Sequence, residues 1–466
     1  MGRRLAARTV AILALGCSLA MSKPSPAGAP APITLGPGDR VLVLAPHPDD
    51  ESLGCGGVLH AAARAGIPAH VVFLTNGDAN ELSFLVWERR PVLTPAGTLA
   101  MGRRRAEEAR AAARALGLPD SATIFLGYPD AGTMAMWTGA WGARPPHESL
   151  LTRATAVPYE TALRPGAPYK PESVVQDLQT VLRRVRPTRL FVSHPDDAHP
   201  DHRAWYLYAM AALWETPDVP PPAVHTYLVH HPHWPAPAAD PRHAPLDPPA
   251  DLASRSVWRH HPLTPADQDA KHAALEAHAT QIAYSRSFLL RFVRADEPFA
   301  ESAPLRLERP DAAADLTGRV APESPDPRVE ATQAARDAFV GVAWRRLERR
   351  GDALTATLEL SRRLLPGTRA VLYFFGARPD HPFAQMPKLR VTVTALGHRV
   401  SDQDAALTAK DVVVERKGRQ LAVIVPLARL DAPRRVLVGA ETVVAEVVVH
   451  PAGWRTIELG AWSRNR

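Results

Sequence analysis

Residues 41–57 read VLVLAPHPDDESLGCGG, and this stretch decides the fold. Val41–Leu44 is a short apolar run that predicts a buried strand. An imidazole, from His47, and the three carboxylates of Asp49, Asp50 and Glu51 follow it, and the glycines beyond them allow a turn directly into a helix. Burying these carboxylates at a strand end is costly unless a cation and hydrogen-bond donors compensate. The stretch predicts a ligand-binding turn, with an acidic surface turn as the alternative.

The same order of strand and helix recurs from Asp39 to about Phe299. Because parallel strands are connected through helices, this alternation predicts an α/β fold: a Rossmann-like, three-layer parallel sheet covered on both faces. We expect strands at 41–44, 69–74, 122–126, 189–193 and 224–230, and helices at 52–65, 103–116, 172–185, 203–214 and 265–284. Two irregular insertions, about 80–102 and 133–171, follow strand ends, where α/β proteins bind ligands. Loops of this length are usually lids, binding loops or disordered segments.

The composition changes after the α/β pattern ends. Residues 304–330 are rich in Pro, Asp, Glu and Ala and predict a linker. Beyond one short helix candidate at 331–339, the β-like runs are 354–360, 370–375, 389–395, 412–415, 421–425, 436–438 and 443–449. Short strands separated by turn residues predict a C-terminal β-sandwich domain over 331–466. The expected domain organisation is therefore a signal segment (1–31), a catalytic domain (32–303), the linker and the sandwich.

Overall composition excludes some classes of function. The chain has 466 residues, 46% of them hydrophobic and 22% charged, which is typical of a globular protein with more than one core. Its formal charge of +7 is carried almost wholly by arginine and is spread thinly along the chain. No dense basic stripe is interleaved with aromatic residues, so we expect no nucleic-acid partner.

The N-terminus predicts export. Arg3, Arg4 and Arg8 precede the apolar run Thr9–Ala20, and small residues follow, as in a secretory signal peptide. The apolar run is short for a membrane span. The segment around Cys17 partly resembles a lipoprotein signal, so periplasmic, secreted and lipid-anchored destinations all stay open. Signal removal leaves one thiol, Cys55, in the chain and no intramolecular disulfide; we interpret Cys55 as a small packing residue at a helix start.

A second polar run completes a metal site. Catalytic zinc sites use three protein ligands and keep one position open. His47 and Asp50 are three residues apart in a tight turn, and His202, in the run 199–202 that reads HPDH, follows the fourth expected strand. In a doubly wound sheet the first and fourth strands are neighbours at the switch point, so these side chains should meet. A His₂Asp set suits zinc, although other divalent metals remain possible from the ligands alone.

The residues left over beside this set suit hydrolysis. Asp49 is placed to take a proton from water as a general base. His199 is placed to stabilise an oxyanion, and Asp201 to orient that histidine or hold its charge. A plain helix-capping role is the alternative for His199.

These motifs resemble the PIG-L/LmbE-type N-acetylglucosaminyl deacetylases. The resemblance rests on the PHPDDE run at 46–51 and the HPDH run at 199–202, and further matches in order are TNGD at 75–78, Arg105 to Glu108 with Leu116-Gly117, GYPD at 127–130, and 271–281. It implies a Rossmann-like fold and zinc-dependent deacetylation of N-acetylated sugars. It also implies His47, Asp50 and His202 as metal ligands, Asp49 as general base and His199 as the residue that stabilises the tetrahedral intermediate.

The resemblance also implies substrate contacts. It assigns Arg105 and Asp130 to the region around the sugar, and we add Asn76 of the TNGD run. The alternatives are a solvated Arg105 paired with Glu108 at helical spacing, and a turn-capping Asp130. The histidines of the run HHPH at 230–233 are interpreted as part of a strand end and its loop rather than as a second metal site.

The sequence therefore predicts an exported, zinc-dependent deacetylase acting on an N-acetylglucosamine-containing sugar or glycoconjugate. The C-terminal domain is expected to contact a cell-envelope glycan. Two alternatives stay open: a zinc amidase or esterase acting on another acyl group, and a carbohydrate-binding surface protein with a degenerate catalytic domain. The resemblance carries no information on the insertions or on residues past about 305.

Overall fold

The computed structural model describes residues 30–89, 92–317, 320–325, 332–403, 405–408 and 411–460. Residues 1–29 of the expected signal segment, Cys17 among them, lie outside the described residues. Within the described ranges, no helix combines the length and apolar character needed to cross a membrane.

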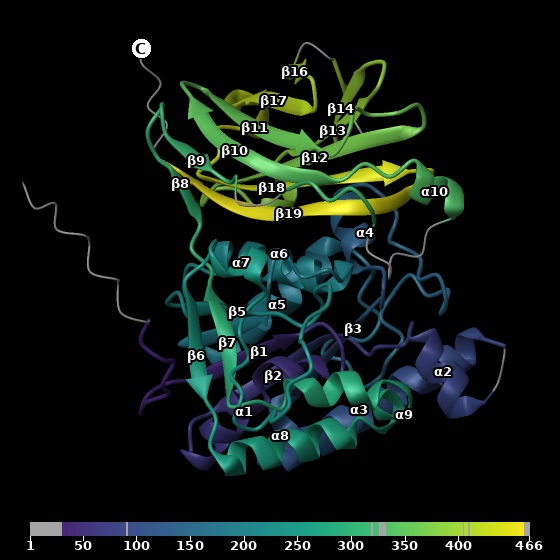
Figure 1. The fold of residues 1–466 in the computed structure, drawn as a ribbon, viewed down its shortest axis with the longest axis vertical. Helices are drawn as coiled ribbons and strands as arrows, with labels where there is room; N and C mark the ends of the chain where they lie inside the picture. The colour runs from purple at the N-terminus through teal and green to yellow at the C-terminus, as the bar shows by residue number, and fades with distance from the viewer. Residues whose placement is uncertain are drawn as a thin grey trace, which may run out of the picture.

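The first domain is built on a seven-stranded sheet with the order β3-β2-β1-β4-β5-β7-β6 (Figure 1). Its parallel strands are β1 (Val41–Ala45), β2 (Ala69–Thr75), β3 (Thr123–Tyr128), β4 (Arg189–Ser193) and β5 (Ala223–Tyr227). Beyond β5, β7 (Asp296–Glu301) pairs antiparallel with β5, and β6 (Trp258–Pro262) pairs antiparallel with β7 at the edge of the sheet. The predicted parallel α/β core is confirmed, but this edge pair was not predicted. The two strands read WRHHP and DEPFAE, and neither has the β-branched pattern of a strand.

The order of the strands places the switch point between β1 and β4. All five residues of β1 are buried. Val41 pairs with Ala69 on one side and with Arg189 on the other, so β4 is the direct neighbour of β1, as the sequence predicts. Because the strand order reverses here, the loops that leave the C-terminal ends of β1 and β4 face the same crevice.

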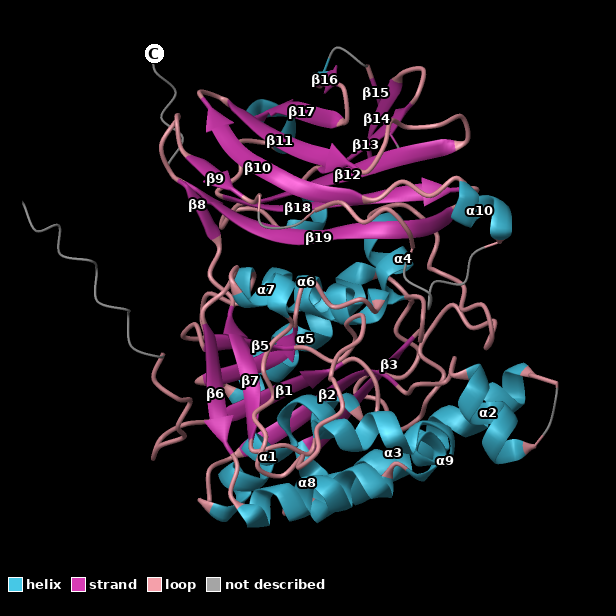
Figure 2. Ribbon diagram, in the orientation of Figure 1, coloured by secondary structure: helices cyan, strands magenta, loops and turns pink. Residues whose placement is uncertain are grey.

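Helices cover both faces of this sheet (Figure 2). One face packs against α1 (Asp50–Arg64), α3 (Pro95–Ala115) and α8 (Pro265–Ala277), and the other against α4 (Thr133–Gly139), α5 (Pro171–Val185) and α6 (Pro200–Trp214). The remaining helices are α2 (Glu81–Glu88), α7 (Ala250–Ala253), α9 (Ala279–Leu289) and α10 (Gln333–Asp337). The two insertions are therefore not irregular throughout, since α2 and the start of α3 lie in the first and α4 in the second. The long helix expected at 265–284 is two helices, which meet at His278.

The second domain is the predicted β-sandwich. One sheet has the order β16-β17-β11-β10-β9 and the other β15-β14-β13-β12-β18-β19-β8, and side chains from both form one core, including Trp344 and Leu358 from the first and Phe374 and Val438 from the second. The strands are β8 (Leu305–Leu307), β9 (Ala313–Asp315), β10 (Val342–Arg350), β11 (Ala353–Leu360), β12 (Thr368–Ala377), β13 (Lys388–Thr394), β14 (His398–Asp402), β15 (Ala405–Leu407), β16 (Val413–Lys417), β17 (Gln420–Pro426), β18 (Arg435–Val444) and β19 (Val447–Leu459).

The expected linker is structured in its first half. β8 pairs in parallel with β19, and β9 pairs with β10, so each extends one sheet of the sandwich. A linker over these residues is therefore wrong. Strands of three residues are too short to produce a readable alternation, and here the open sheet edges supply the pairing that orders them.

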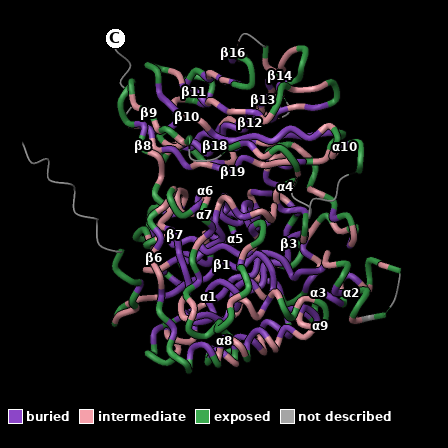
Figure 3. The backbone as a smooth tube through the Cα atoms, viewed as in Figure 1, coloured by how far each residue is buried: buried purple, intermediate pink, exposed green. Residues whose placement is uncertain are grey.

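The two domains share a hydrophobic core. The outer face of the sheet that contains β12, β18 and β19 packs onto α4 and α6, and Figure 3 shows these strands as largely buried. Trp137 of α4 is fully buried between the domains; its ring centroid lies 4.9 Å from that of Tyr208 and 5.7 Å and 5.8 Å from those of Phe375 and Phe383. The sandwich is thus an integral wall of the molecule on the side of α6, the helix that carries the HPDH run.

Candidate active site

The turn after β1 holds a strained residue at its centre. Asp49 is the N-cap of α1 and has φ 134° and ψ −28°, a backbone conformation that L-residues rarely adopt. Its backbone N–H donates to Glu51 Oε2 at 2.9 Å. Strain of this kind costs on the order of 1–3 kcal/mol and persists where surrounding contacts enforce it, which is common at functional sites.

The carboxylate of Asp50 lies between two buried histidines where the predicted metal site should be. Asp50 Oδ2 lies 3.1 Å from His47 Nδ1 and 3.1 Å from His202 Nε2. Ligand atoms on a tetrahedral ion with bonds of about 2.0–2.1 Å are about 3.3 Å apart, so this spacing fits such an ion. His202 Nε2 is fully buried and has no well-aligned hydrogen bond within the described residues, as expected of an atom aimed at a shared ion. The donor set of two imidazoles and one carboxylate therefore fits a divalent metal.

Carboxylates stand behind both histidines. His202 Nδ1 lies 3.2 Å from Asp197 Oδ2, and His47 Nε2 lies 3.3 Å from Asp201 Oδ2 and 3.1 Å from Asp130 Oδ1. A carboxylate at the second ring nitrogen fixes the tautomer and orientation of a metal-ligating histidine. Asp197 was not predicted, although its place in the loop after the fourth strand, two residues before the HPDH run, was a usable signal.

The carboxylate of Asp201 has other hydrogen-bond partners than His199, the residue that the sequence assigns to it. Its carboxylate accepts hydrogen bonds from Ala131 N at 2.7 Å and from Thr133 N at 3.1 Å, and it faces His47. The backbone N–H of Asp201 donates to His199 Nδ1 at 3.2 Å, so His199 is the N-cap of α6. The expected orientation of His199 by this carboxylate is therefore wrong, because Asp201 is turned toward the β3–α4 loop. The capping geometry of His199 is real, and it leaves Nε2 as the nitrogen that carries hydrogen in the neutral ring.

His199 stays close to the metal-ligand candidates despite its capping role. Its ring centroid is 4.8 Å from that of His47 and 5.2 Å from that of His202. Burial, with the positive charge of His47 as a second cause, lowers the pKa of His199 to about 3. A neutral ring beside the cluster can donate one hydrogen bond from Nε2.

The carboxylate of Asp49 differs from the candidate metal ligands in that it faces the guanidinium of Arg105. Arg105 Nη2 lies 3.6 Å from Asp49 Oδ2. Burial raises the pKa of Asp49 to about 7, and the Arg105 guanidinium opposes that rise. A carboxyl group with a pKa near the working pH can both accept and return a proton.

Arg105 binds the two loops of the site rather than solvent. It is buried, and its guanidinium donates to Gly77 O at 2.8 Å and to Pro48 O at 2.7 Å. The alternative of a solvated Arg105 paired with Glu108 is wrong, since Glu108 accepts from Thr280 Oγ1 at 2.7 Å instead. Gly77 has φ 66°, and a Cβ there would lie 2.1 Å from the guanidinium, so a larger residue would displace Arg105.

Asp130 and Asn76, the other two predicted substrate residues, differ in whether a side-chain atom remains available to a ligand. Asp130 accepts from Ala79 N at 2.7 Å and faces His47, so its carboxylate is occupied within the protein. Asn76 is buried; its Nδ2 donates to Gly102 O at 3.4 Å, while Oδ1 lacks a partner in the described parts of the chain. Of this pair, Asn76 therefore retains an acceptor that a ligand can use.

His230 belongs to the site, contrary to the interpretation of the 230–233 run as only a strand-end loop. Its ring centroid lies 4.8 Å from that of His202 and 5.4 Å from that of His199. Together with Asp50 and His202 it forms a set whose ligand atoms lie within 4.8 Å of one another. The backbone N–H of His230 donates to Asp197 Oδ2 at 3.0 Å, which ties this loop to the cluster. The run of histidines after a strand was the usable signal in the sequence, but the fold decides which residues these histidines meet.

A buried contact between Glu51 and His278 supports the strained turn at Asp49. His278 Nε2 lies 2.9 Å from Glu51 Oε1, and Glu51 in turn accepts from the backbone N–H of Asp49. Glu51 and His278 are each about 1% exposed or less. The break between α8 and α9 thus places His278 where it holds the conformation of Asp49.

The chain is similar in sequence to known deacetylases. Residues 42–213 match the family described as PIG-L: GlcNAc-PI de-N-acetylase. A 1D-myo-inositol 2-acetamido-2-deoxy-alpha-D-glucopyranoside deacetylase from Streptomyces griseus subsp. griseus is 30% identical over 279 residues, which cover 54% of this chain and 78% of the relative. The protein of the same description from Salinispora arenicola is 29% identical, and the match covers 39% of this chain and 52% of the relative.

Among solved structures, the N,N'-diacetylchitobiose deacetylase from Pyrococcus horikoshii is similar, with 19% identity and a TM-score of 0.35. The match covers 56% of this chain and 82% of that one. Residues beyond 213 lie outside the family match, and so the β-sandwich has no counterpart in it.

Proposed function

We infer that this chain, which belongs to the PIG-L family, is a metal-dependent hydrolase. The reaction that we propose is removal of the N-acetyl group from an N-acetylglucosamine-containing sugar or glycoconjugate. Acetate and a free amine are the products.

One observation carries this proposal: Asp50 Oδ2 lies 3.1 Å from His47 Nδ1 in its own loop and 3.1 Å from His202 Nε2 in a loop distant in sequence, and Asp49 directly precedes Asp50. A degenerate domain would have no reason to keep this set together with the carboxylates behind it. The set argues against a carbohydrate-binding module whose first domain has lost its chemistry.

His47, Asp50 and His202 are the residues that would hold the ion, for which zinc is our proposal. When bound, such an ion supplies Lewis-acid polarisation of an amide carbonyl and lowers the pKa of water. Asp49 accepts a proton from the attacking water as the water oxygen bonds to the acetyl carbon. His199 donates a hydrogen bond from Nε2 to the developing oxyanion. Asp49 then returns its proton to the amide nitrogen as the carbon–nitrogen bond breaks.

The remaining residues of the site position these groups. The guanidinium of Arg105 faces the Asp49 carboxylate and donates to the Pro48 and Gly77 carbonyls, and Asp201 with Asp130 holds the ring of His47. Asn76 is our candidate for a direct contact with the sugar, because its Oδ1 can accept from a hydroxyl group.

The proposal includes export. Its support is the basic start and the short apolar run Thr9–Ala20, which are typical of a signal segment. Contact of the β-sandwich with a cell-envelope glycan is the companion proposal. N-terminal sequencing of the mature protein from fractionated cells tests the first, and a loss of residues before about position 31 is the expected result.

Acetate release tests the function directly. The metal-loaded protein should release acetate from methyl N-acetyl-β-glucosaminide, and a chelator should abolish this activity. Asp49→Asn should lower kcat by about 10²–10⁴-fold without loss of bound metal. Asp311→Asn, at an exposed carboxylate of the sandwich side, is the matched control and should behave as wild type. Full activity of Asp49→Asn would contradict the assigned role.

A further inference from the structure

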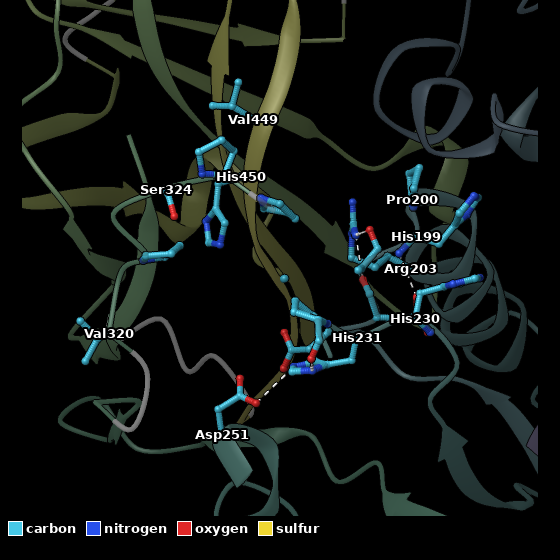
Figure 4. A pocket seen from close by; sticks show the side chains of 18 residues that line it. His199, Pro200, Arg203, His230, His231, Asp251, Val320, Ser324, Val449 and His450 are labelled. Atoms are coloured by element: carbon cyan, nitrogen blue, oxygen red, sulfur yellow. Dashed lines mark hydrogen bonds and ion pairs between the residues drawn. The ribbon is translucent and has the colours of Figure 1, made fainter. Parts of the chain in front are cut away.

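A cavity of about 780 Å³ lies between the candidate active site and the β-sandwich. Figure 4 shows His199, Arg203, His230 and His231 on one side of it and Val449 with His450 on the other. Its wall therefore comes from both domains. Sites of this volume hold ligands the size of a drug molecule, so the cavity exceeds what an acetyl group fills.

The cavity lies next to the predicted chemistry. His199 and His230 line it, and their rings lie 4.8 Å from those of His47 and His202, respectively. A substrate whose amide carbonyl sits beside the metal ligands would thus extend any attached group directly into this space.

The lining favours an apolar occupant. Its apolar members are Ala198, Pro200, Pro232, Val320, Pro322, Pro325, Val449 and Pro451, and none of the described lining residues is Phe, Tyr or Trp. A sugar ring buried here would need hydrogen-bond partners for each of its hydroxyl groups. The polar members of the lining are Asp196, Asp197, His199, Arg203, His230, His231, Asp251, Ser324 and His450, but most of the surface that lines the cavity is apolar.

Two polar groups of the lining, the guanidinium of Arg203 and the ring of His231, are already engaged within the protein. Arg203 Nη1 donates to Asp197 O at 2.8 Å and to Ala198 O at 2.7 Å. His231 Nε2 lies 3.2 Å from Asp251 Oδ1. Because these groups have partners, the cavity gains more from burying an alkyl group than from binding a charged or hydroxylated one.

We propose that this interdomain cavity is a subsite for an aliphatic group carried by the substrate, so that the β-sandwich selects the substrate together with the catalytic domain. The inference rests on the proposed function and deepens it. Two positions on an N-acylated sugar can supply the aliphatic group: the acyl chain itself, or an alkyl aglycone. The cavity chemistry is the same for both, and experiment separates them.

Two pairs of substrates provide that separation, each used below its micelle concentration. The aglycone arm compares n-octyl with methyl N-acetyl-β-glucosaminide. The acyl arm compares the N-octanoyl with the N-acetyl form of the methyl glucosaminide. We expect kcat/KM to rise about tenfold or more for the octyl compound in one arm. Equal values within both pairs would overturn the subsite.

A variant ties the preference to this cavity. Val320 lines the cavity and its side chain is 79% exposed, so Val320→Asp introduces a charge with little risk to folding. We expect this variant to reduce the octyl-to-methyl ratio toward one. Leu396→Asp, at a fully exposed leucine of the sandwich, is the matched control and should keep the wild-type ratio. An unchanged ratio in Val320→Asp would overturn the assignment of the preference to this cavity.

A binding measurement keeps the inference separate from the proposed function. Calorimetric titration of Asp49→Asn with the same four compounds reports affinity without turnover. If no compound is hydrolysed by the wild-type protein, the proposed function fails, while tighter octyl binding that Val320→Asp removes still supports the cavity. If hydrolysis occurs but octyl and methyl compounds bind equally, the cavity inference alone fails.

Discussion

Arg455 of the β-sandwich forms a two-point ion pair with Asp196 of the catalytic domain. The Nη1–Oδ1 distance is 2.9 Å and the Nη2–Oδ2 distance is 3.1 Å. Asp196 directly precedes Asp197, whose carboxylate lies against His202. A Cβ at Gly453 would lie 2.0 Å from Asp196 Oδ1, so the close approach of β19 requires glycine there. The second domain therefore holds the loop that supports a metal-ligand candidate.

Arg455→Met should weaken metal binding and lower stability. Both partners of the ion pair are largely buried, and removing one partner of a buried pair costs about 3–5 kcal/mol. Chelator competition and chemical denaturation measure the two effects. Arg306→Met, which removes an exposed arginine of the same domain, should change neither quantity. Wild-type metal affinity in a folded Arg455→Met protein would show that the pair does not position the site.

Asp197→Asn should lower metal affinity while the fold is kept. The change removes the charge that faces His202 Nδ1 but preserves the shape of the side chain. Loss of such an outer carboxylate typically lowers metal affinity by about 10–100-fold. Competition with a chromogenic chelator gives the constant, and circular dichroism checks the fold. An affinity equal to that of Asp311→Asn would contradict the supporting role.

Trp137→Ala should uncouple the two domains. The ring is fully buried between α6 and the sandwich, and truncating such a side chain costs about 3–5 kcal/mol. Calorimetry should show a lower unfolding temperature. The single unfolding transition should also begin to split into two, one for each domain. Trp87→Ala, at a half-buried tryptophan of α2, should leave the cooperativity of unfolding unchanged.

Lys388→Met should remove part of the pH dependence of stability. Lys388 is buried in the interdomain core, and desolvation lowers its pKa from 10.5 to about 7. Between these values the unfolded chain binds a proton that the native protein does not, so this group makes the free energy of unfolding rise with pH. The wild-type value should rise relative to the variant by up to about 1.4 kcal/mol per pH unit from pH 7 to 10.

Urea unfolding at several pH values measures this difference. Lys417→Met, at an exposed lysine of β16, is the control and should run parallel to wild type. Parallel curves for Lys388→Met would show that the amine stays charged in the native protein.

The catalytic half of the fold was predictable because its signals are local. Most of the parallel strands contain a short apolar run, and the predicted helices have their own spacing of apolar residues, so neither signal depends on distant contacts. The edge strands β6 and β7 and the three-residue strands β8 and β9 carry no such pattern. Their pairing is supplied by β5, β19 and β10, which the sequence around them does not reveal.

The candidate site divides in the same way. The sequence by itself predicted the candidate ligands His47, Asp50 and His202 and the neighbouring Asp49, because each motif lies in one turn and the strand order brings the turns together. Only the tertiary structure decided that Asp201 supports His47 rather than His199, that His230 joins the cluster, and that β19 closes the cavity. These outcomes depend on which loops meet in space, and a buried carboxylate takes whichever donor the packing brings to it.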